Sequence, residues 1–257
     1  MLSRRMSGLL SSLRHKKYRK LHGLFLAEGI KIVDELLRSS FAVHSVFAVE
    51  QWIEANRHKV PTTTDIISIS EQELHKISQL HTPQQVVAMV RIPDIAPDYA
   101  TMTDDFILAL DELQDSGNLG TILRTADWFG IKWVVCSHGC VDLYNPKTVQ
   151  ATMGSIARVK VCYLDLKEFL SKLRNKIPVY GAVLDGRSIS TVAFSTPGIL
   201  IIGNEAHGLS PGIKPFISQP VSISAYPAVS LASTLPESLN ASVAAAIALY
   251  ELRRQFQ

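Results

Sequence analysis

Apolar and polar positions alternate along the chain with two different periods, which predicts a mixture of strands and helices. Four apolar residues share one face of a helix predicted over 28–39: Ile32, Val33, Leu36 and Leu37. Shorter apolar runs predict strands at 25–27, 43–49, 66–67 and 86–90, and a second helix at 52–58. Short strands that alternate with helices predict a small α/β domain, which we assign to residues 1–95.

The alternation becomes sharper after residues 92–104, a stretch with prolines and aspartates and no periodicity that we interpret as a linker. The predicted strands that follow are 106–110, 133–136, 159–161, 179–183, 199–202 and 221–223. They are apolar on both faces, as is typical of a parallel sheet covered by helices. Helices fit between them, and the last is predicted over 239–254. A second α/β domain is therefore assigned to residues 103–257.

Composition is that of an ordinary globular protein, but the charge is unevenly placed. The chain has 257 residues and a net charge of +3, and its first 20 residues contain seven Lys or Arg and no acid. Four of these form the predicted RNA-binding set: Arg14, Lys16, Lys17 and Arg19. Such an arm fits a polyanion held through its phosphates, and it fits a solvated charged helix equally well. It also has features of a transit peptide, although it runs directly into a patterned helix.

The three cysteines, Cys136, Cys140 and Cys162, are too few for a disulfide framework, which fits a cytoplasmic protein. Cys136 and Cys140 flank a histidine, but no second ligand pair accompanies them, so we expect no metal. A GxGxxG fingerprint and a GxSxG elbow are both missing from the sequence. A nicotinamide-dinucleotide site and a serine hydrolase are therefore poorly supported.

A polar turn follows the strand at 106–110 and leads into a helix. Ligands of parallel sheets gather where strands end, so Asn118 in this turn is a candidate site residue. Arg124 lies on the face of the following helix opposite Ile122 and Leu123, where its side chain can reach a phosphate. The pattern also fits an ordinary exposed helical arginine.

Two further segments carry candidate chemistry. The strand at 199–202 runs into Gly203, where a ligand can approach the backbone closely, and Glu205, which can accept hydrogen bonds. Ser238 or Asn240 would cap the last helix, whose free N–H groups suit a carboxylate or phosphate. A plain strand-to-helix turn and simple capping explain these two segments as well.

Taken together, the three segments resemble the three motifs of the SpoU (TrmH-like) RNA ribose methyltransferases of the SPOUT class. The matching patterns are NxGxxxRTAxxFG at 118–130, GNExxGLS at 203–210 and ESLNxSVAAAI at 237–247. The stretch DLYNPKTVQATMGSIARVKV at 142–161 is also typical. The N-terminal part, with LAEGIKIVDELL and TPQQVVAMV, resembles the ribosomal-protein-like substrate-binding domain of this family.

The resemblance implies a trefoil-knotted α/β fold, a homodimer whose active site draws on both subunits, and an RNA substrate, ribosomal or transfer. It implies S-adenosyl-L-methionine as cofactor, contacted by Gly203, Ile223 and Leu239. It also implies a catalytic surface made of five residues: Asn118, Arg124, Glu205, Ser238 and Asn240. The expected reaction is methylation of a ribose 2′-hydroxyl. A base methyltransferase on the same fold and a non-catalytic RNA-binding protein are the alternatives.

The sequence departs from the family pattern in two places. Ser116 stands where a proline usually follows Asp115, which loosens a turn. Ser224 and Ala225 replace a Pro-Met pair, and the loop 224–235 is longer than usual before the third motif. Because this loop normally wraps the cofactor, the second departure bears on cofactor affinity.

Overall fold

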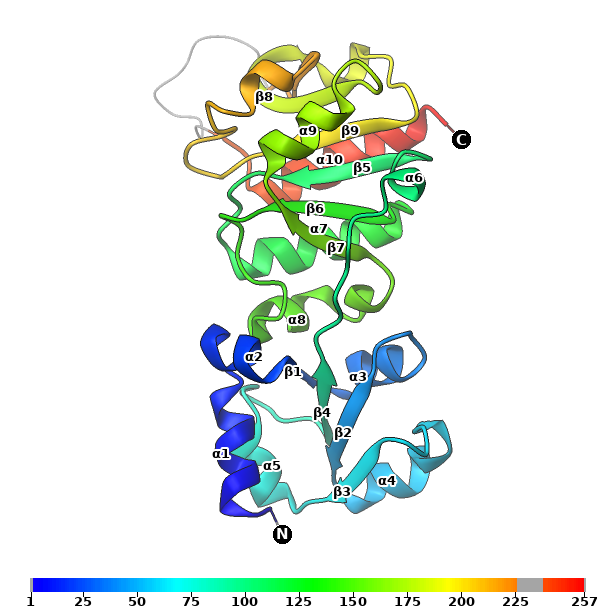
Figure 1. The fold of residues 1–257 in the computed structure, drawn as a ribbon, viewed down its shortest axis with the longest axis vertical. Helices are drawn as coiled ribbons and strands as arrows, with labels where there is room; N and C mark the ends of the chain where they lie inside the picture. Colours follow the sequence, from blue (N-terminus) through cyan, green and yellow to red (C-terminus); the bar gives the residue numbers. More distant parts are fainter. Residues whose placement is uncertain (1, 226–237, 257) are drawn as a thin grey trace. The chain divides into compact units, whose positions relative to one another are not determined.

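The computed structural model describes residues 2–225 and 238–256, and the chain forms two compact units. The N-unit consists of Met1–Asp94 and Asp142–Arg158, and the C-unit of Ile95–Val141 and Val159–Gln257. Both are α/β structures, as predicted (Figure 1). Among the described residues, no helix is both long and apolar enough to cross a membrane.

The N-unit is built on a four-stranded sheet with the order β1-β4-β2-β3. Its strands are β1 (Leu24–Glu28), β2 (Val43–Ala48), β3 (Asp65–Ser68) and β4 (Val86–Arg91). β4 runs antiparallel to β1 and β2, whereas β2 and β3 are parallel. The helices are α1 (Arg4–Ser12), α2 (Lys16–His22), α3 (Ile30–Leu37), α4 (Glu50–Asn56), the 3₁₀ turn η1 (Arg57–Lys59) and α5 (Glu71–Ile77). The strands predicted from the sequence are confirmed, and α5 was not predicted.

A segment from the middle of the chain completes the N-unit. It contains α8 (Pro146–Thr152) and the 3₁₀ turn η2 (Ser155–Ala157). Asn145 caps α8, and Pro146 at its first position has the fixed φ that a helix start requires. The ring of Tyr144 packs 4.7 Å from that of Phe25 on β1, and Arg158 forms an ion pair with Glu35 of α3. Residues 142–158 therefore belong to the packed structure of the N-unit.

The C-unit is built on a six-stranded sheet with the order β10-β8-β9-β5-β6-β7 among the described residues. The strands are β5 (Phe106–Leu110), β6 (Trp133–Ser137), β7 (Lys160–Leu164), β8 (Val179–Ser188), β9 (Gly198–Ile202) and β10 (Gln219–Ser222). Every pairing between them is parallel, so the predicted parallel sheet is confirmed. In consequence, all their carboxyl ends lie at one edge of the sheet, where ligands of such folds bind.

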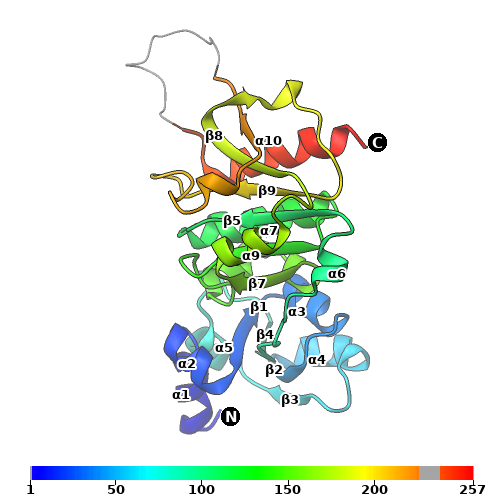
Figure 2. The same ribbon diagram turned by 45° about the horizontal axis from the view of Figure 1, so that its top comes forward.

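Helices cover both faces of this sheet, which explains why its strands are apolar throughout. α9 (Leu166–Leu173) packs on one face against a core that includes Ile107, Val135 and Ile201, all buried. On the other face, α7 (Ser116–Trp128) and α10 (Ala241–Arg254) lie side by side (Figures 1 and 2). The remaining described turns are α6 (Tyr99–Met102) in the predicted linker, η3 (Ile189–Thr191) and η4 (Lys214–Phe216).

The connection from β10 to α10 includes residues 226–237, which lie outside the described residues. The predicted trefoil knot and the predicted effect of the loop 224–235 both depend on this connection. They stay predictions.

Candidate active site

Side chains from the three motif segments join in one hydrogen-bond chain at the carboxyl edge of the C-unit sheet. The Asn118 Nδ2 donates to Glu205 Oε1 at 2.5 Å, and the Asn240 Nδ2 donates to Asn118 Oδ1 at 3.0 Å. Asn118 lies on α7, Glu205 follows β9, and Asn240 precedes α10. Three residues that are far apart in the sequence therefore form one polar surface.

Helix capping sets the positions of the two asparagines. The Asp115 Oδ1 accepts the backbone N–H of Asn118 at 2.8 Å, so α7 begins at Ser116 and carries Asn118 in its first turn. Asn240 is the N-cap of α10, and its Oδ1 accepts the N–H groups of Ser242 (2.9 Å) and Val243 (3.4 Å). Because the cap uses the Asn240 oxygen, its amide nitrogen is free to donate to Asn118.

The loop that carries Glu205 is held by cross-links to the turn after β5. Asn204 and Gly208 exchange backbone hydrogen bonds of 3.0 and 2.9 Å, which closes the loop. The Asn204 Nδ2 donates to the carbonyl of Glu112 at 2.8 Å, and Asp111 Oδ2 accepts the N–H of Ser210 at 2.7 Å. Neither Asn204 nor Asp111 was among the predicted site residues, since both bonds go to backbone groups that are distant in the sequence.

Gly203 has a structural reason to be a glycine. A Cβ at this position would lie 2.4 Å from the carbonyl carbon of Gly208 and 2.7 Å from the amide nitrogen of Leu209. From the sequence, we expected a ligand to lie against the backbone of Gly203. In the structure, the backbone of the loop itself occupies the space where a side chain at this position would lie. Gly203 therefore permits the closed loop that positions Glu205.

The other predicted site residues take no part in this hydrogen-bond chain. Arg124 is exposed on α7, and its side chain forms no hydrogen bond or ion pair with the residues the structure describes. Ser238 and Leu239 are exposed just before α10, and Ile223 is half-buried directly after β10. The structure therefore joins Asn118, Glu205 and Asn240 by direct bonds and leaves the remaining side chains open to a ligand.

A pair of thiols lies beside the same turn. The Cys140 Sγ donates to the carbonyl of Leu110 at 3.2 Å, immediately before Asp111. Its contact with Cys136 lowers the pKa of Cys140 to about 7, while the same contact and burial raise the pKa of Cys136. All three cysteines are free and buried. Among the described residues, no group of His, Cys, Asp and Glu side chains could hold a metal ion.

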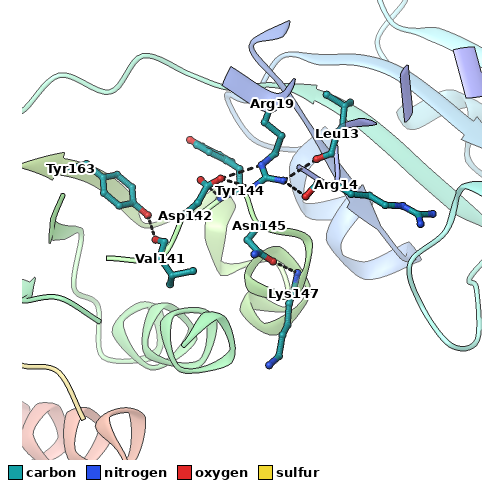
Figure 3. A network of polar contacts seen from close by, with 9 residues as sticks. All are labelled: Leu13, Arg14, Arg19, Val141, Asp142, Tyr144, Asn145, Lys147 and Tyr163. Carbon is teal, nitrogen blue, oxygen red and sulfur yellow. Dashed lines mark hydrogen bonds and ion pairs between the residues drawn. The ribbon is translucent and has the colours of Figure 1, made fainter. Parts of the chain in front are cut away.

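The basic arm does not present all of its charges to solvent. Arg19 is only 2% exposed, and its Nη2 and Nε donate to Asp142 Oδ2 at 2.6 and 3.1 Å. Its Nη1 donates to the carbonyls of Leu13 and Arg14 (Figure 3). The prediction that Arg19 binds RNA is therefore corrected, because its guanidinium is occupied within the N-unit.

The other members of the predicted RNA-binding set differ in exposure. Arg14 is half-buried and donates to the carbonyl of Ser78 at 3.3 Å. Lys16 and Lys17 are exposed on α2. These two lysines therefore remain candidates for contacts with phosphate.

A parallel α/β sheet with a polar site built from three separate motifs defines a class of proteins. Comparison with known families identifies this class. The SpoU rRNA Methylase family model matches residues 105–250, and the MRM3-like substrate binding domain model matches residues 9–88. The chain belongs to the SpoU rRNA methylase family, and the family predicted from the sequence is confirmed.

Individual relatives resemble the whole chain. The 23S rRNA (guanosine(2553)-2′-O)-methyltransferase RlmP of Bacillus subtilis is 30% identical over 94% of this chain and 93% of its own length. A candidate RNA methyltransferase of the TrmH family from Porphyromonas gingivalis has a solved structure with a TM-score of 0.88 and 36% identity, covering 99% of both chains. The AdoMet-bound rRNA methyltransferase of Sinorhizobium meliloti has a TM-score of 0.86 and 27% identity, covering 100% of this chain and 97% of that one.

Proposed function

We propose that this protein methylates a ribose 2′-hydroxyl of ribosomal RNA, with S-adenosyl-L-methionine as the methyl donor. The observation that carries the proposal is the hydrogen-bond chain Glu205–Asn118–Asn240, which joins the three family motifs at one edge of the sheet. Family membership and the 2′-O-methyltransferase activity in the name of the Bacillus subtilis relative support it.

The residues at the sheet edge fit this cofactor. Gly203 and Ile223 follow strands β9 and β10, whose carboxyl ends lie at the same edge because both are parallel to β8. Leu239 is 46% exposed and, with the half-buried Ile223, offers apolar surface to a flat adenine ring. When bound, the cofactor supplies an electrophilic methyl group on a sulfonium. We assign Gly203, Ile223 and Leu239 to its binding.

The catalytic residues have to orient a weak nucleophile and stabilise the charge that develops on it. A guanidinium stays protonated, so Arg124 is assigned to hold a substrate phosphate and to stabilise the forming alkoxide. Asn118 fixes Glu205 through Oε1, and Glu205 accepts a hydrogen bond from the substrate or the cofactor. Asn240 holds Asn118 in turn, and the exposed Ser238 is assigned to the same surface.

The C-unit also carries an exposed apolar stripe that supports the proposal of a homodimer. Val243, Ile247 and Tyr250 recur at helical spacing on α10 and are all exposed, and Trp128 on α7 is 86% exposed. Contiguous apolar surface of this kind usually marks a protein interface. We propose that two copies pair through this stripe and that each active site draws on both subunits.

The proposed division of labour follows the two family models. Residues 1–95 are assigned to RNA binding, with Arg14, Lys16 and Lys17 as phosphate contacts. Residues 103–257, apart from the segment 142–158 that packs in the N-unit, are assigned to methyl transfer. The free, buried cysteines fit a reducing compartment, and we propose a cytoplasmic location.

Titration of the whole protein with S-adenosylmethionine tests the cofactor assignment. We expect heat release in calorimetry and a higher melting temperature, because a ligand that binds only the native state shifts unfolding by mass action. S-adenosylhomocysteine should compete, and ATP serves as a control for non-specific binding of adenosine. Absence of both signals at millimolar cofactor would contradict the proposal.

A further inference from the structure

Helix α2 presents an aromatic ring and an aliphatic side chain among lysines on the surface of the N-unit. The side chains of Tyr18 and Leu21 are 38% and 69% exposed. Lys16, Lys17 and Lys20 are exposed on the same helix, and the Lys17 Nζ lies 5.9 Å from the centre of the Tyr18 ring. The catalytic assignment uses neither Tyr18 nor Leu21.

The arginine in the middle of the helix fixes which side faces out. Arg19 points inward and is bound by Asp142 and by the carbonyls of Leu13 and Arg14, as Figure 3 shows. With 3.6 residues per turn, Lys17 and Leu21 lie nearly opposite Arg19, and Tyr18 lies about a quarter turn away. The buried ion pair therefore holds Tyr18 and the neighbouring Lys17 in a defined orientation before any partner binds.

The rings around Tyr18 widen this surface. His22 is nearly parallel to Tyr18, with an interplanar angle of 14° and centroids 6.5 Å apart, and His15 approaches the same ring edge-on at 6.4 Å. Flat rings beside positive charges are the combination with which proteins bind single-stranded nucleic acid: the rings stack on bases and the charges contact phosphates.

We propose that α2 binds an unpaired nucleotide of the RNA substrate, whose base stacks on Tyr18 while Lys17, whose Nζ lies beside that ring, contacts a flanking phosphate. The proposal rests on the proposed function and adds the kind of RNA the N-unit selects, which is a single-stranded loop or bulge. Sequence-specific RNA recognition usually targets such splayed bases.

Charge complementarity favours RNA over a protein partner on this surface. The first acidic residue of the chain is Glu28, so nothing of opposite sign offsets the lysines of α2 within the preceding sequence. Glu28 itself is buried and bound to Ser78 and Gln79. A polyanion with exposed bases satisfies both the lysines and the ring, whereas an apolar protein surface would leave the lysines desolvated.

The test compares two variants of the full-length protein with the wild type, on a single-stranded RNA and on a duplex of the same length. Tyr18→Ala should weaken binding to the single strand by about five- to hundredfold, the range measured for loss of one base stack, and leave duplex binding unchanged. Tyr18→Phe keeps the flat ring and should bind within about twofold of wild type. Ile30→Ala removes an apolar side chain of the N-unit that is 44% exposed on α3, so it is the matched control and should have no effect.

Salt dependence separates stacking from charge. Tyr18→Ala should leave the slope of log Kd against log salt unchanged, because the ring carries no charge, whereas Lys17→Ala should reduce it. Equal binding of Tyr18→Ala and wild type, or equal losses on both RNAs, would overturn the proposal. Unfolding midpoints establish that each variant is folded. If wild type methylates RNA and Tyr18→Ala still binds normally, only this proposal fails; if wild type methylates no RNA, the proposed function fails.

Discussion

The substitution Asn118→Asp replaces the hydrogen bond between Asn118 and Glu205 by a repulsion between two carboxylates. In Asn118→Asp, an oxygen replaces the Nδ2 that lies 2.5 Å from Glu205 Oε1, so a donor becomes a second carboxylate oxygen. Two unit charges at this distance repel by roughly 2 to 7 kcal/mol for effective dielectric constants between water and a protein surface. Loss of a hydrogen bond to a charged group adds about 1.5–3 kcal/mol. Both side chains are half-buried, so the lower values apply.

The expected consequence is a loss of activity that depends on pH. Misplacement of Glu205 that costs about 3 kcal/mol of transition-state stabilisation would lower the rate of methyl transfer by about two orders of magnitude at alkaline pH. The two carboxyls can relieve the repulsion by sharing one proton, which raises the apparent pKa of the pair. Lowering the pH should therefore restore an O–H···O bond and raise the rate of the variant relative to wild type.

The assay is transfer of labelled methyl groups to RNA, measured for both proteins across the pH range in which they stay folded. Asn118→Ala is the control: it removes the donor without adding a charge, so its rate relative to wild type should be independent of pH. The reasoning is refuted if Asn118→Asp matches wild type at alkaline pH. It is also refuted if its relative rate shows no more pH dependence than that of Asn118→Ala.

Four further substitutions test other parts of the structure. Arg124→Ala should lower methyl transfer at least about a hundredfold and leave cofactor affinity within a few-fold by calorimetry, because the side chain is assigned to substrate charge. Gly203→Ala should lower both the melting temperature and cofactor affinity, since its Cβ meets the backbone of Gly208. Arg19→Ala should lower the free energy of unfolding in urea by about 3 kcal/mol, because Asp142 loses its partner. Burial raises the pKa of Glu28 above its ordinary value of 4.5, so the contribution of Glu28 to the free energy of unfolding falls as the pH rises from 4.5 through the folded pKa. Glu28→Gln should remove this fall when the free energy of unfolding is measured in urea at several pH values.

Local patterns were sufficient to predict the strands of both units and the start of the last helix. The strand at 106–110 is apolar throughout because both of its faces are covered, and Asn240 was one of two candidate caps for α10. The helix α5 was missed although its sequence carries a local signal. Ser70 and Glu73 form a capping box, with serine and glutamate three residues apart.

Features that depend on packing between distant segments could not be predicted. Arg19 and Lys17 are equivalent basic residues in the sequence. The acceptors that bury Arg19, which are Asp142 and the carbonyls of Leu13 and Arg14, are known only from the fold. In the same way, the carboxylate of Asp111 and the amide of Asn204 bind backbone groups of a distant segment. A motif shows which residue types are present, whereas their partners follow from the topology of the sheet.

Nucleoside analysis of the methylated RNA tests the central claim most directly. Ribosomal RNA is incubated with the protein and S-adenosylmethionine labelled on the methyl group, digested completely to nucleosides and separated by chromatography. We expect the label in 2′-O-methylated nucleosides and none in base-methylated ones, and Arg124→Ala should incorporate almost none. Label in a modified base, or RNA that binds the protein and stays unlabelled, would contradict the claim that this site methylates a ribose hydroxyl.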